Sequence, residues 1–115
     1  MTNAALIVFS VVHMVARIIT GECGGVAQEA GPAMAIIAMN RREIGWGWSG
    51  WNAIADEPEN WALDIAWEAW RKGEDTSGNL YALSGADMES LGFGEDDWEN
   101  VGNDKWPIWV GRAWQ

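Results

Sequence analysis

Polar residues follow one narrow line along the first part of the chain, and this spacing constrains the fold more than any other feature. They recur at steps of seven, three, four and three residues: Asn3, Ser10, His13, Arg17 and Thr20. Such steps place side chains on one face of an α-helix. The remaining positions are apolar, and a helix that is apolar over most of its surface is normally buried. We therefore expect a largely buried helix from about residue 4 to residue 22, with His13 in a structural role.

The opposite stripe of this helix ends in a carboxylate. Val11, Val15, Ile18 and Glu22 follow at steps of four, three and four, and two glycines after residue 23 can end the helix. Partial desolvation and the negative end of the helix dipole both favour the protonated form of a carboxyl group. A general acid that works near neutral pH needs that form. Glu22 is therefore the candidate catalytic acid.

Two more helices are predicted downstream, separated by a loop. The first runs from about Pro32 to Ile44 and is apolar all round in its first turns, which predicts a central helix. The loop, residues 45–52, alternates glycine with Trp46, Trp48 and Trp51, so its backbone can bend while the rings remain available along one wall.

The third helix is predicted from its end signals. Asp56 is a plausible N-cap with Glu59 at the capping-box spacing, and Gly73 follows the last turn. We expect Trp67 on this helix to be a core residue. Beyond Gly73 the pattern indicates loops, a short helix within residues 84–94 and a short strand near the end of the chain. The predicted fold is therefore mostly α, with about three main helices and a loop-rich C-terminal part.

Composition limits the function. The 115 residues suit a single domain, and the net charge of −10 lies entirely in residues 56–115, so phosphate-rich nucleic acid is a poor partner. Cys23 is the only cysteine, which excludes an intramolecular disulfide and a thiolate metal cluster. The acidic residues 95–104 do not match a calcium-binding EF-hand, and a solvated loop is the simpler interpretation. No metal and no cofactor are expected. The apolar run from residue 4 to residue 12 is too short for a membrane span and lacks the features of a signal peptide.

Three segments, in order, resemble the SleB-type cell wall hydrolase family. Residues 15–23, VARIITGEC, are similar to the family's opening L-A-R-x-I-x-G-E-A. Gly25, Glu29 and then Asn40-Arg41 match the next family segment, G-E-x-x-E-G-Q-x-A-V-A-x-V-x-x-N-R. Residues 74–81, EDTSGNLY, resemble D-x-T-G-G-A-L-Y-F. The chain departs from the family pattern at Val26, Ser77 and Asn79.

The resemblance implies a lysozyme-like fold and cleavage of the β-1,4 bond between N-acetylmuramic acid and N-acetylglucosamine in peptidoglycan. It places the family's catalytic glutamate at Glu22, so the protein is expected to act on the cell wall. We expect Thr76 and Tyr81 to position the sugar, and Trp46 and Trp48 to stack against it in a groove close to Glu22.

Two chemistries of cleavage fit the sequence. A lytic transglycosylase needs one carboxylate, whereas hydrolysis requires a second carboxylate to activate water, for which Glu29 and Asp75 are candidates. Two other functions also fit the sequence: a glycan-binding module without turnover, and a structural protein whose tryptophans form an interface.

Overall fold

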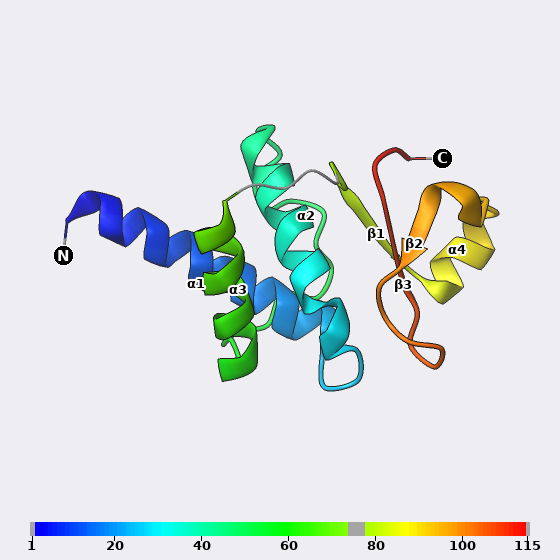
Figure 1. The fold of residues 1–115 in the computed structure, drawn as a ribbon, viewed down its shortest axis with the longest axis horizontal. Helices are drawn as coiled ribbons and strands as arrows, with labels where there is room; N and C mark the ends of the chain where they lie inside the picture. The colour runs from blue at the N-terminus through cyan, green and yellow to red at the C-terminus, as the bar shows by residue number, and fades with distance from the viewer. Residues whose placement is uncertain (1, 74–77, 115) are drawn as a thin grey trace.

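The computed structural model describes residues 2–73 and 78–114, which form two lobes (Figure 1). The larger lobe contains the long helices α1, α2 and α3, and the smaller lobe contains a sheet and the short helix α4. The helices span α1 Asn3–Cys23, α2 Gly31–Glu43, α3 Asn60–Lys72 and α4 Gly85–Leu91, with short 3-10 turns at Gln28–Ala30 and Glu95–Asp97. The strands are β1 Tyr81–Ser84, β2 Trp98–Asn100 and β3 Ile108–Gly111. The expected fold class, mostly α with short strands, is confirmed.

Helix α1 follows the pattern read from the sequence along its second half. Val11, Val15 and Ile18 are buried in the core, and the helix ends at Cys23 with Gly24 at a positive φ of 54°. This conformation favours glycine. The core-facing stripe therefore carries Glu22 to the last turn of α1, as predicted.

The first turns of α1 differ from the expectation. Leu6, Ile7 and Phe9 are 48%, 57% and 51% exposed, and this end of the helix projects away from the other elements (Figure 1). The core begins only at Val11 because α2 and α3 pack against the later turns. Among the described residues, α1 is also the helix whose length and mean hydropathy of 1.9 would allow it to cross a membrane. One third of that window is buried inside the protein.

Helix α3 begins later than its capping signals suggest. The N-cap is Glu59, not Asp56, and its side chain makes no capping hydrogen bond. The backbone N–H of Glu59 instead donates to the hydroxyl oxygen of Thr20 on α1, at 3.1 Å. The preceding residues are thus held across α1, and this tertiary contact overrides the local capping box.

The sheet is antiparallel in the order β1-β3-β2, with β3 at its centre. Gly111 on β3 pairs with Tyr81 on one side and Trp98 on the other. A Cβ at Gly111 would lie 2.9 Å from the Trp98 ring, so the absence of a side chain lets the ring lie over β3. The segment around Leu80 to Leu83, interpreted as loop from the sequence, contains β1 because β3 supplies its hydrogen-bonding partner.

The core consists of two apolar clusters, and the larger one connects the two lobes. The larger one joins α1, α2 and α3 to Val110 of β3, and the smaller one joins the sheet to α4 through Leu83, Met88 and Trp98. Trp67, expected in the core, is 36% exposed, whereas Trp98 is only 7% exposed. The helical stripe of α3 buries Ala62 and Ala66 and turns Trp67 to its edge.

Candidate functional site

Glu22 lies in a cleft between the two lobes, with a volume of about 680 Å³. The helical lobe supplies the end of α1 and the turn that follows it, and the smaller lobe supplies the start of α4 and the turn between β2 and β3. The lining residues are Glu22, Cys23, Val26, Ala27, Ser84, Gly85, Ala86, Glu89, Asp104, Lys105, Trp106, Pro107 and Ile108. The cleft therefore depends on the packing of both lobes.

Glu22 is a partly buried residue, and its carboxylate is bound by a backbone N–H. The N–H of Ala53 donates to Oε1 of Glu22 at 3.3 Å. One carboxylate oxygen is therefore engaged, and the group is held in place by a segment distant in the sequence.

That segment, residues 53–59, is tied to the polar line of α1. Arg17 Nε donates to the carbonyl of Ala55 at 2.8 Å, and the N–H of Ala55 donates back to the carbonyl of Arg17 at 3.1 Å. Thr20 fixes the far end by accepting from the N–H of Glu59. Two residues of the polar line of α1, Arg17 and Thr20, thus have a structural role: they hold the segment whose Ala53 N–H binds Glu22.

Cys23 is buried directly beside the candidate acid. Burial, the charge of Glu22 and the charge of Glu29 together raise the pKa of the Cys23 thiol to about 12. A thiol with such a pKa is protonated at neutral pH and cannot act as a nucleophile. His13 cannot activate it from its own position on α1, where its ring stacks on Phe9.

Glu29, a candidate second carboxylate, is engaged elsewhere. Its Oε1 accepts from Asn103 Nδ2 at 2.7 Å, and the same nitrogen donates to the carbonyl of Val26 at 2.9 Å. The hydrogen bond from Asn103 lowers the pKa of Glu29. Glu29 therefore joins the turn after α1 to the turn after β2. Asp75, the other candidate, lies outside the described residues.

The structure brings three residues into the cleft that the sequence did not single out. Glu89 of α4 and Asp104 add carboxylates, and Trp106 adds a ring that is 48% exposed. Ser84, which caps α4 by accepting from the N–H of Asp87 at 3.1 Å, brings the helix against the cleft. Trp106 is far from Glu22 along the chain, so no local sequence pattern could connect the two.

Trp46 and Tyr81 are brought together, but away from the lining of this cleft. Their ring centroids are 5.8 Å apart, and Tyr81 also contacts Trp114 at 5.6 Å. Trp46 is 39% exposed and lies against Arg41, whose guanidinium also covers Trp51. Desolvation lowers the pKa of Arg41, and Tyr81 opposes this shift.

Trp48 packs against the core and lines a separate groove beside the first turns of α1. Trp46 and Trp48 therefore do not line the cleft that contains Glu22, although the Gly/Trp loop ends one residue before Ala53. Arg41 on α2 binds the loop through the carbonyl of Ser49, at 2.9 Å. Thr76 lies outside the described residues.

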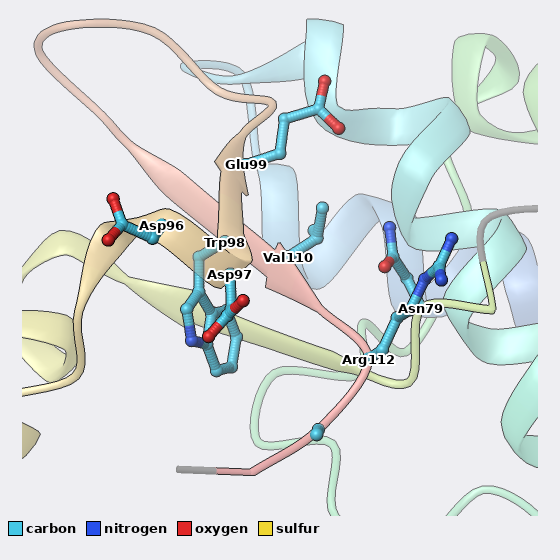
Figure 2. A pocket seen from close by; sticks show the side chains of 8 residues that line it. Asn79, Asp96, Asp97, Trp98, Glu99, Val110 and Arg112 are labelled. Atoms are coloured by element: carbon cyan, nitrogen blue, oxygen red, sulfur yellow. The ribbon is translucent and has the colours of Figure 1, made fainter.

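A second cavity, of about 640 Å³, lies on the smaller lobe (Figure 2). Three exposed carboxylates, Asp96, Asp97 and Glu99, surround it, with Arg112 and Asn79 near one another on its other side. Glu22 differs from them in lining a cleft between the two lobes and in accepting a backbone hydrogen bond, so it is the better candidate for acid catalysis.

Comparisons with protein-family models, curated proteins and solved structures found no match to this chain. In the described part of the chain, no group of three or more His, Cys, Asp and Glu residues is arranged to hold a metal ion.

Proposed function

We propose that the protein cleaves the glycan strands of peptidoglycan at the β-1,4 bond after N-acetylmuramic acid, with Glu22 as general acid and base. One observation carries the proposal: Glu22 lines an inter-lobe cleft, and its carboxylate accepts a hydrogen bond from the Ala53 N–H. The similarity of residues 15–41 and 74–81 to the SleB-type family supports the choice of substrate.

A single carboxylate is sufficient for a transglycosylase. Glu22 donates its proton to the glycosidic oxygen as the bond to muramic C1 breaks. The C6 hydroxyl of the same sugar then attacks C1, and the ionised Glu22 takes the hydroxyl proton. The product carries a 1,6-anhydro ring, and Glu22 returns to its protonated form.

Hydrolysis would use water in place of the C6 hydroxyl and would require a second carboxylate. Glu89 and Asp104 are better placed for this than Glu29, because they line the cleft. Trp106 offers an apolar ring face on which a sugar ring can stack.

A second candidate function is glycan binding without turnover. The observation that favours it is the partly exposed aromatic group of Trp46, Tyr81 and Trp114, which lies outside the cleft. Such rings can bind sugars without taking part in cleavage.

Lysis of purified cell walls separates these functions. Wild-type protein should reduce the turbidity of a wall suspension, and Glu22→Gln should not, although it should still fold. Glu99→Gln is the matched control, since Glu99 is exposed on the smaller lobe and lines the other cavity. Sedimentation with walls without lysis would indicate a binding module. The absence of both lysis and sedimentation would contradict both functions.

A further inference from the structure

Residues 4–9, in the exposed end of α1, are apolar without interruption, and the polar residues Asn3 and Ser10 flank them. Leu6, Ile7, Val8 and Phe9 are consecutive, so at about 100° per residue they surround the helix axis. Leu6, Ile7 and Phe9 are each about half exposed. Val8 packs toward the core, and the three exposed side chains span roughly 160° of the helix surface at about 100° per residue. This arc is wider than the stripe that packs against one partner helix, and it suits an apolar medium around the exposed side.

This end of α1 carries no charged side chain. Arg17 is the first charged side chain of the chain, and residues 1–55 contain three acidic and three basic residues. The excess negative charge lies in residues 56–115, and residues 78–114, which form the smaller lobe, hold seven acidic and two basic residues. The molecule is 48 Å long, and Figure 1 shows the first turns of α1 and the smaller lobe at opposite ends of that axis.

A groove continues the apolar surface onto the body of the protein. It is lined by Leu6, Ile7, Ser10, Val11, Met14, Arg42 and Trp48. Tryptophan and arginine at the base of an apolar helix are the residues that favour the headgroup region of a bilayer.

A second copy of the chain is a poorer occupant. Residues 3–10 form a helix about 12 Å long, which can bury on the order of 200 Å² on one face. A stable dimer needs roughly 800 Å² from each partner.

We propose that residues 3–10 insert into the surface of a lipid bilayer and hold the protein there with its acidic lobe pointing away. The helix does not span the membrane, because the core begins at Val11. At 1.5 Å per residue, α1 places Glu22 about 18 Å beyond Ser10, so the cleft stays in the aqueous phase. The insertion is independent of what the cleft does.

The test is sedimentation of the full chain with phosphatidylcholine vesicles. Wild-type protein should sediment with the vesicles, and 0.5 M salt should not release it because the attraction is apolar. Ile7→Asp should reduce the bound fraction at least tenfold, and Ile7→Leu should not. Leu91→Asp is the matched control, since Leu91 is 44% exposed on α4 at the acidic end.

Three results would overturn the proposal: wild-type protein that remains in the supernatant, Ile7→Asp that binds equally well, or release of the wild type by salt. Circular dichroism checks that Ile7→Asp is folded, and the double variant Leu6→Ser/Ile7→Ser repeats the test without adding charge. A lipid-free dimer that Ile7→Asp dissociates would assign the surface to a second copy and would also contradict insertion.

Discussion

Gly21 on α1 and the carbonyl of Ala53 lie so close that a Cβ at residue 21 would be 1.3 Å from the carbonyl oxygen. The glycine that precedes Glu22 is therefore required by packing, since it lets residues 53–59 cross the helix. This crossing also brings the Ala53 N–H to the Glu22 carboxylate. One contact thus connects the core of the helical lobe with the candidate acid.

Gly21→Ala should displace this segment and destabilise the protein by about 1–3 kcal/mol, the usual cost of overpacking. Thermal or urea unfolding measures the change, and wall lysis should fall with it. Gly25→Ala is the control because a Cβ there meets no atom within 4 Å. Equal stability of the two variants would show that the crossing does not depend on Gly21.

Cys23 should be inert in the native protein. Its pKa of about 12 and its burial predict slow reaction with a thiol reagent at pH 8, and rapid reaction only after denaturation. Cys23→Ala should retain activity within a few-fold. Rapid loss of activity in the wild type, with the alanine variant spared, would instead support a cysteine nucleophile.

The same pKa predicts a stability profile. The folded state holds the Cys23 proton more tightly than the unfolded chain, whose thiol keeps the ordinary value near 9.0. The stabilisation is complete below pH 9 and is lost as pH rises toward 12. The free energy of unfolding of the wild type, measured in urea, should therefore decrease more steeply over this range than that of Cys23→Ala. Parallel profiles would contradict the raised pKa.

Trp98 and Trp67 should differ in their effect on stability. Trp98 is buried over Gly111, so Trp98→Ala should cost about 3–5 kcal/mol. Trp67→Ala removes a partly exposed ring and should cost less than about 1 kcal/mol. Chemical denaturation of both variants measures the difference, and similar costs would show that the smaller lobe does not rely on Trp98.

Local sequence patterns predicted the main features of α1 and α2. The stripe of Val11, Val15 and Ile18 predicted the buried face of α1, and Gly24 predicted its end. Pro32 marked the start of α2 to within a residue. These features depend on residues close together in the chain.

Contacts between distant residues explain what the sequence did not predict. Thr20 moves the start of α3 to Asn60, and β3 turns the segment at Tyr81 into a strand. The cleft around Glu22 is completed by Trp106, which only the pairing of β2 with β3 brings near α1. Periodicity placed Glu22 correctly on its helix but could not identify the other wall of its cleft.

Mass spectrometry of the fragments released from purified peptidoglycan tests the central claim most directly. Wild-type protein should release muropeptides ending in 1,6-anhydro-muramic acid, which are one water lighter than the reducing-end products of hydrolysis. Reducing-end products would retain Glu22 as the acid and assign the second step to water. Release of either product by Glu22→Gln at the wild-type rate, or of neither by the wild type, would contradict the assignment of Glu22 as the catalytic acid.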